Sequence, residues 1–509
     1  MADNKNNQPD YTNADYSTAV NEMTAVQDVC EGTEAVRKKG LTYLPRHFAE
    51  QEDSYRARLA VATLYPATAR TWQGLVGMVF RREIKLAADV PAGIRGEVGA
   101  EGKPKTEGHW ENIDNAGTHG SLFAQHSFEC AVRDGHSAIF VDMPTELPPG
   151  ATQADEEGRR PHWVHYEKSQ ILLPIRTVVE NGQLFIQQIR FRERSSEPDG
   201  EFGEVVVERI RVLKREWVKD EAGNQSPKVS WQLYKKVKND KGEDAWIDDG
   251  NGKIVMPGKP GEIPVTFVYT RKTGLGKSCP PLTAMAEQNL KHYRHESNLE
   301  KSLNMAIAIP CAAGADPAKT KIVVGTESLM TVEKAGDFWF AEATGTGIKP
   351  LQEEIDKTES RMAKIGLSLL EPKTPQPTTA TENILDSVKE ESELSTWVKW
   401  LKDAIERCLG WHAAYLNEKS GGSLEITATL QRIALAPEKL RVLADMQSSD
   451  QLTLETLWDL MARAEELPEG FEKKKEQQGL ERVKAEKAAQ QQAIGAAFGQ
   501  GFDRGGFGG

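Results

Sequence analysis

The stretch that decides the fold begins with PLTAMAEQNLKHYRHESNLEKSLN at residues 281–304. Its apolar side chains recur at helical spacing, and Pro281 suits a helix start because the first N–H groups of a helix have no intrahelical partner. A second helix is predicted at 351–370. The next segment, EPKTPQPTTAT at 371–381, contains three prolines and cannot continue that helix. The pattern therefore predicts two helices that bracket a compact insertion and are followed by a proline-rich loop.

Upstream of this stretch, the period of the apolar residues changes twice. Helical spacing predicts helices from about Ala19 to Cys30, at Glu52–Leu64, around Trp72–Val79 and at Ser121–Arg133. Residues 138–141 read as a buried strand. Between 162 and 270 apolar and polar residues alternate, and Asn-Gly and Asp-Gly pairs separate the runs. This region is predicted to be mostly antiparallel β-sheet.

Downstream of the proline-rich loop, the chain is predicted to be mainly helical. The expected elements are a long helix at 382–417, a short strand at 423–429 and two helices at 437–446 and 453–466. The polar N-terminus at 1–16 is expected to be disordered, and 471–509 to be frayed helix and disorder. Together the elements predict an α+β fold.

Composition sets further limits on the class of protein. The chain has 509 residues, of which 39% are hydrophobic and 28% are charged, as in an ordinary globular protein of several domains. No apolar run approaches the roughly 20 residues that cross a bilayer, and the N-terminus lacks signal-peptide features. We therefore expect no membrane association. The widely spaced cysteines, Cys30, Cys130, Cys279, Cys311 and Cys408, argue against a zinc site or a disulfide framework.

The formal net charge of −12 bears on nucleic-acid binding. Proteins that hold DNA tightly neutralise phosphates with a basic surface. Either nucleic acid is not a ligand, or DNA is handled without tight binding, as in a channel through which it slides.

One segment resembles a phosphate-binding loop. Thr273-Gly-Leu-Gly-Lys-Ser278 ends like such a loop, but the loop requires glycine where Arg271 stands. Pro280 and Pro281 would also remove N–H groups that such a site uses. We expect no phosphate contact from Lys277.

Other candidate groups have simpler structural explanations. His292 and His295 are predicted to be exposed helix residues, and His162 and His165 to share one face of a strand. Asp134, His136 and Asp142 flank the strand at 138–141, where turn capping is more common than acid–base chemistry. Trp397, Trp400 and Trp411 have the spacing of helix core or subunit contacts rather than base-stacking platforms. No catalytic residue, metal site or cofactor is predicted.

The order of several short motifs resembles tailed-bacteriophage portal proteins, in particular a divergent group formerly described as a family of unknown function. The motifs are Tyr43-Leu-Pro45, Glu52-x-x-Tyr55-x-x-Arg58-Leu59, Gly77-Met-Val-Phe80, Asn112-Ile-Asp114, Val141-Asp142-x-Pro144 and Thr379-Ala-Thr381. The resemblance covers about residues 17–466.

The resemblance implies a portal fold with named regions. They are a wing at 17–280, stem helices at 281–304 and 351–370, a clip at 305–350, a tunnel loop at 371–381, a long wing helix and strand at 382–430 and a helical crown at 431–470. The loop residues implied to face DNA are Glu371, Pro372, Lys373, Thr374, Pro375, Gln376, Pro377, Thr378 and Thr379.

The implied function is structural rather than enzymatic. Portal subunits form a homo-oligomeric ring, typically a dodecamer, at one capsid vertex. Double-stranded DNA passes non-specifically through this ring during packaging and ejection. The implied partners are the terminase large subunit, major capsid and scaffold proteins and a head–tail adaptor, with assembly in the host cytoplasm and a final place in the virion. The alternatives are another phage head component, such as a minor capsid or adaptor protein, and a nucleotide-dependent enzyme that uses Lys277 and Ser278.

Overall fold

The structure is a computed structural model. It describes residues 7–48, 50–98, 104–144, 159–219, 223–238, 242–305, 309–312, 338–341, 348–368, 393–426, 453–463, 471 and 473–499. The chain divides into two units, Met1–Ala428 and Thr429–Gly509. Helices and antiparallel sheets both contribute to the first unit, so the fold class is α+β, as predicted.

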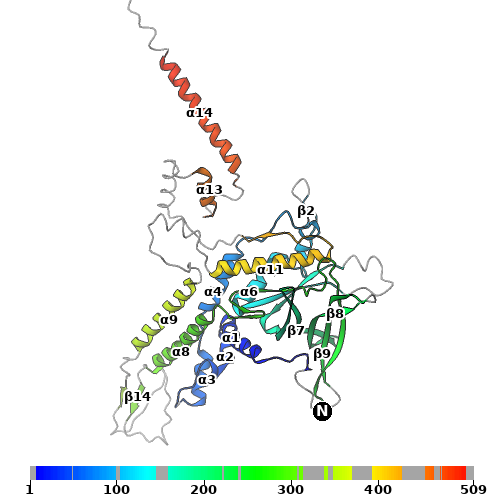
Figure 1. Cartoon of the computed structure of the whole chain (residues 1–509). Coiled ribbons are helices and arrows are strands. Elements are labelled where there is room, and N and C mark those ends of the chain that lie inside the picture. The colour runs from blue at the N-terminus through cyan, green and yellow to red at the C-terminus, as the bar shows by residue number, and fades with distance from the viewer. Residues whose placement is uncertain are drawn as a thin grey trace, which may run out of the picture. The chain divides into compact units, whose positions relative to one another are not determined.

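Helices from the N-terminal third form one part of the first unit (Figure 1). They are α1 (Ala14–Glu31), α2 (Thr33–Lys38), α3 (Glu52–Val61), α4 (Ala67–Val79), the short α5 (Ala92–Arg95) and α6 (Gly120–Asp134). Helix α1 buries Met23, Val26 and Val29, which lie three residues apart and so share one face. This face packs against α4, α6 and the later helix α8 (Thr283–Met305).

Two antiparallel sheets form the rest of the first unit. The larger has the order β10-β9-β8-β7-β6 and consists of β6 (Ile171–Glu180), β7 (Gln183–Asp199), β8 (Gly203–Lys219), β9 (Gln225–Lys238) and β10 (Asp244–Ile254). The smaller has the order β11-β4-β5, with β4 (His136–Asp142) between β11 (Val265–Tyr269) and β5 (His162–Glu167). Phe140 of β4 lies opposite Val265 and Val164. The antiparallel sheet predicted for 162–270 is confirmed.

One hydrophobic core joins the two sheets. Phe140 and Phe267 of the smaller sheet belong to the same buried cluster as Phe191 and Leu213 of the larger one. The rings of Tyr166 and Phe191 stack with centroids 3.9 Å apart. The sheets therefore form a single packed body rather than two independent domains.

Helix α11 (Glu393–Tyr415) packs against β11 and β4. Its stripe of Trp397, Leu401, Ile405 and Leu409 is buried, as helical spacing predicts. After α11 the chain forms β16 (Leu424–Glu425), which pairs with β1 (Lys85–Leu86) near the other end of the sequence. The strand predicted at 423–429 is thus observed over two residues.

The N-terminal segment differs from the sequence prediction. Within the stretch expected to be disordered at 1–16, residues 7–16 have defined structure: Asn13 caps α1, and the Tyr16 hydroxyl donates to the Ser169 carbonyl at 2.6 Å. In the second unit, helices α13 (Leu454–Arg463) and α14 (Lys473–Gly499) are observed. Helix α14 lies within the stretch that the sequence predicts to be frayed helix and disorder, 471–509. The helix predicted at 437–446 lies outside the described residues.

Within the part of the chain that the structure describes, no helix combines the length and the apolar character needed to cross a bilayer.

Candidate functional site

Two long helices and a small strand pair form the most distinctive arrangement in the first unit. Helices α8 and α9 (Ile348–Ser368) lie side by side (Figure 1). Between them in the sequence, β14 (Ile309–Ala312) pairs with β15 (Phe338–Ala341), and Ile309 lies opposite Ala341. The helices predicted at 281–304 and 351–370 are therefore observed.

The contact between α8 and α9 is both polar and apolar. Lys291 forms an ion pair with Glu354 at 2.6 Å. Ile355, Thr358 and Met362 of α9 are buried at spacings of three and four residues, so one face of α9 covers α8. The opposite face of α9 is mostly exposed.

Helix α8 is fixed to the N-terminal helices by buried hydrogen bonds. The Asn289 side-chain oxygen accepts from the Thr68 amide at 3.1 Å and from its hydroxyl at 2.9 Å. The Asn289 amide nitrogen donates to the Tyr65 carbonyl at 2.8 Å. Arg294 donates to the Tyr43 carbonyl at 3.1 Å. These bonds hold the start of the helix pair rigidly on the body.

The prediction that His292 is exposed was wrong. His292 is 1% exposed, and its Nε2 atom lies 3.2 Å from Glu359 of α9 and 3.4 Å from Glu296 of α8. His295 is partly buried, and burial lowers the pKa of its imidazole. Periodicity places His292 on a polar face of an isolated helix, but α9 covers that face.

The predicted tunnel loop at 371–381 lies outside the described residues, and so do all nine residues from Glu371 to Thr379. Its position in the chain is bracketed by the end of α9 at Ser368 and the start of α11 at Glu393.

The segment that resembles a phosphate-binding loop is a small β-hairpin, formed by β12 (Lys272–Gly274) and β13 (Lys277–Ser278). Lys277 forms an ion pair with Asp15 at 2.6 Å, and the Ser278 hydroxyl lies 2.7 Å from Nδ1 of His136. The next helix, α8, begins only at Thr283. Lys277 and Ser278 thus have structural partners, and no helix N-terminus lies where a phosphate would need it.

The Asp134, His136 and Asp142 side chains do not form one site. His136 and Asp142 lie at opposite ends of β4, about 20 Å apart at ~3.3 Å per residue. Asp134 is buried and accepts two hydrogen bonds from Arg133 and one from Gln27. The three side chains therefore do not have the arrangement that acid–base catalysis would require.

The prediction that His162 and His165 share a face was also wrong. The two residues are separated by an odd number of strand positions, so their side chains point to opposite faces. His165 stacks edge-on with His126 of α6, at 4.7 Å between centroids. Burial, in contrast, is the main reason that the pKa of His162 is lowered, and the nearby Asp142 carboxylate opposes this shift.

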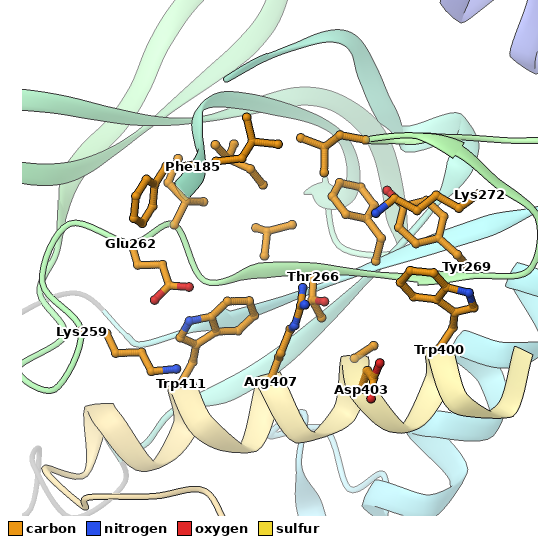
Figure 2. Close-up of a pocket in the computed structure, with 17 residues that line it drawn as sticks. Phe185, Lys259, Glu262, Thr266, Tyr269, Lys272, Trp400, Asp403, Arg407 and Trp411 are labelled. Carbon is orange, nitrogen blue, oxygen red and sulfur yellow. The ribbon is translucent and has the colours of Figure 1, made fainter. Parts of the chain in front are cut away.

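A pocket of about 430 Å³ lies between α11 and the two sheets (Figure 2). The Nζ atom of Lys272 lies 5.1 Å from the ring centroids of both Tyr269 and Trp400, a cation–π arrangement. Lys259 lies similarly over Trp411, at 5.9 Å. Of the lining residues, the sequence had singled out only Trp400 and Trp411. Trp397 and Trp411 are buried, as core tryptophans were expected to be.

The charges of the pocket are mixed. Lys259, Lys272 and Arg407 supply positive charge, and Glu262 and Asp403 supply negative charge. Figure 2 shows the Arg407 side chain rising from α11 toward the strand that carries Thr266. The lining residues include no histidine, cysteine or serine.

Comparisons with known proteins give a match to a family model and matches to solved structures. Residues 281–416, from the start of the α8 region to the end of α11, match the family model of a domain of unknown function, DUF4055. No curated protein matches the sequence. Among solved structures, the chain is similar to one described as a virion of a native gene transfer agent particle. The identity is 13% and the TM-score 0.35, over 82% of this chain and 96% of that chain.

Proposed function

We propose that the chain is a portal subunit of a tailed-phage head. In this role, copies of the chain form a ring at one vertex of the capsid, and double-stranded DNA passes through the ring during packaging and ejection. The proposal includes a virion location, a ring of about twelve copies, and contacts with terminase, capsid and scaffold proteins and a head–tail adaptor.

The observation that carries the proposal is the α8–α9 helix pair together with the strand pair β14–β15. Helix α8 is anchored through Asn289 and Arg294 to the N-terminal helices, and α9 returns alongside it. The pair β14–β15 stands between them in the sequence, and α11 follows. This order of a stem helix, a small β insertion, a returning stem helix and a long helix is what the motif resemblance implies for a portal.

Charge and surface properties support a ring that handles DNA without gripping it. The net charge of −12 repels the phosphate backbone, so DNA is not held by counterion release over a broad surface. The single chain has several exposed apolar side chains. Among them are Phe48 and Phe202, which are 109% and 92% exposed. Contacts between copies in a closed ring would cover such side chains.

Electron microscopy of the purified chain, combined with light scattering, tests the proposal. We expect closed rings with a central channel. A chain that stays monomeric over a wide range of protein and salt concentrations contradicts the proposal. Rings that support no DNA packaging in a reconstituted reaction with terminase and capsid shells would favour an adaptor or minor capsid protein instead.

A further inference from the structure

Three side chains with metal-binding atoms converge between α6 and β5, away from the α8–α9 pair. His126 and Cys130 lie one helical turn apart on α6, and His165 lies on the adjoining strand β5. One ligand atom from each of the three lies within 4.8 Å of the other two. This is the one such group of histidine, cysteine or carboxylate ligands among the described residues.

The two imidazoles are suited to donate lone pairs. The Nε2 atom of His165 is buried and has no hydrogen-bond partner among the described residues. His126 is exposed and can change rotamer freely.

The charges around Cys130 also favour a bound cation. The Cys130 thiol points to the Glu167 carboxylate, with 3.9 Å between Sγ and Oε1. Asp134, Glu167 and Glu129 add negative charge around the thiol, and Arg133 is the counter-charge. Arg133 is itself engaged by Asp134 at 2.8 Å and by Glu167 at 3.3 Å. A cation therefore meets a net negative environment.

We infer that His126, Cys130 and His165 form a three-ligand site for Zn²⁺ that ties α6 to β5. Two imidazole nitrogens and one thiolate are ligands that Zn²⁺ prefers. Bond lengths of about 2.0 Å to nitrogen and 2.3 Å to sulfur place tetrahedral ligands about 3.3–3.6 Å apart. The ligand atoms must therefore move about 1 Å closer together when the ion binds. A change in the conformation of the exposed His126 side chain can provide this movement. Water completes the coordination at the open side.

Binding replaces the thiol proton of Cys130 with the metal, so one proton is released to solvent for each ion bound. The ligands come from two elements of the body. The ion therefore adds to the stability of the folded chain by an amount that grows with the free Zn²⁺ concentration.

The experiment is a titration of the untagged, chelator-treated full chain with Co²⁺ and Zn²⁺. We expect one Co²⁺ per chain, with the near-ultraviolet thiolate-to-cobalt band and the visible bands of tetrahedral cobalt, and its displacement by Zn²⁺. His126→Asn and Cys130→Ser should each weaken Zn²⁺ binding at least about tenfold, which is the smallest effect usual for losing even an outer partner of a metal site. Zn²⁺ should raise the melting temperature of the original chain and not that of either variant.

Matched controls separate this site from other thiols and imidazoles. Cys279→Ser and His47→Asn alter an exposed cysteine and an exposed histidine elsewhere, and both should keep the cobalt spectrum. Circular dichroism confirms that each variant is folded. His126→Asn changes a surface side chain, so it remains informative if Cys130→Ser unfolds. Absence of the thiolate band in the folded chain, or unchanged Zn²⁺ affinity in His126→Asn, overturns the inference.

Discussion

Glu50 and Arg58 form a charge pair whose side chains are only 1% and 6% exposed. Arg58 donates to both carboxylate oxygens of Glu50, at 2.9 and 2.7 Å, and to the Pro45 carbonyl at 3.0 Å. The hydrogen bond from Arg58 is the main reason that the pKa of Glu50 falls to about 2. Arg58 belongs to one of the motifs on which the portal resemblance rests, and its role here is structural.

Arg58→Ala should lower the free energy of unfolding by about 3 kcal/mol, because it leaves the buried Glu50 carboxylate with only Lys301 and the His47 backbone N–H as partners. Urea denaturation measures the change. Arg56→Ala is the matched control: its partner is Glu52, and the two side chains are 72% and 53% exposed, so the loss should stay below about 1 kcal/mol. Equal losses of unfolding free energy in the two variants would show that the buried ion pair stabilises the fold no more than the exposed one.

Two buried histidines make stability depend on pH. Burial lowers the pKa of His136 to about 3, with a contribution from Lys168. Burial lowers the pKa of His412 to about 3 as well, with contributions from His109, Arg160 and His162. Both imidazoles stay neutral in the folded chain, whereas in the unfolded chain they take up a proton near their ordinary pKa of 6.5.

The stability that these two histidines contribute is therefore complete above about pH 6.5 and falls steadily as the pH is lowered toward 3. Each should contribute a slope of about 1.4 kcal/mol per pH unit in that window. Urea denaturation between pH 7.5 and 5 measures the slope. His412→Gln should have a shallower slope than the original chain. The same slope in both would mean that His412 does not titrate on unfolding.

At the scale of elements, the α8–α9 contact determines whether the helix pair stays closed. Met362→Ala removes a side chain that is 1% exposed, and buried Met→Ala changes cost about 2–5 kcal/mol. We expect faster amide hydrogen exchange throughout α9 because the local opening of this helix becomes easier. Lys357→Ala, on the exposed face of the same helix, should leave exchange unchanged. If Met362→Ala does not change the protection of the α9 amides from hydrogen exchange, the contact that stabilises this helix lies elsewhere.

Periodicity predicted most of the elements but not all of their environments. The stripe of α11 and the alternation of β9 are local patterns, so the sequence alone reveals them. The burial of His292 depends on α9, which lies more than fifty residues away in the chain. His126 and Cys130 are four residues apart, so helical spacing in the sequence already places them together. The third ligand, His165, is brought to them only when β5 pairs with β4. Cysteine spacing alone could not reveal that site.

At the scale of the whole molecule, the proline-rich loop is the segment through which the proposed ring would act on DNA. Its prolines keep the segment out of helix, and its threonines are small and neutral, so they can line a passage without gripping phosphate. We expect deletion of residues 375–379 to leave rings intact by electron microscopy and to reduce packaged or retained DNA. A control deletion of five residues in the C-terminal segment 501–509 should affect neither.

Loss of rings after the deletion would make the loop a contact between subunits. Normal DNA retention would remove its proposed role, and that of Lys373 with it.

The pairing of β1 with β16 also affects how the chain folds as it is made. Lys85 lies opposite Glu425, so 340 residues (425 minus 85) separate the partners. A ribosome adds about 5–20 residues per second, so Lys85 waits roughly 20–70 s before its partner strand has been synthesised. Until α11 has been synthesised, the faces that it will cover on β4 and β11 remain open to solvent. The nascent chain thus carries an unfinished core, with high contact order, and presents a binding surface to chaperones until translation has nearly ended.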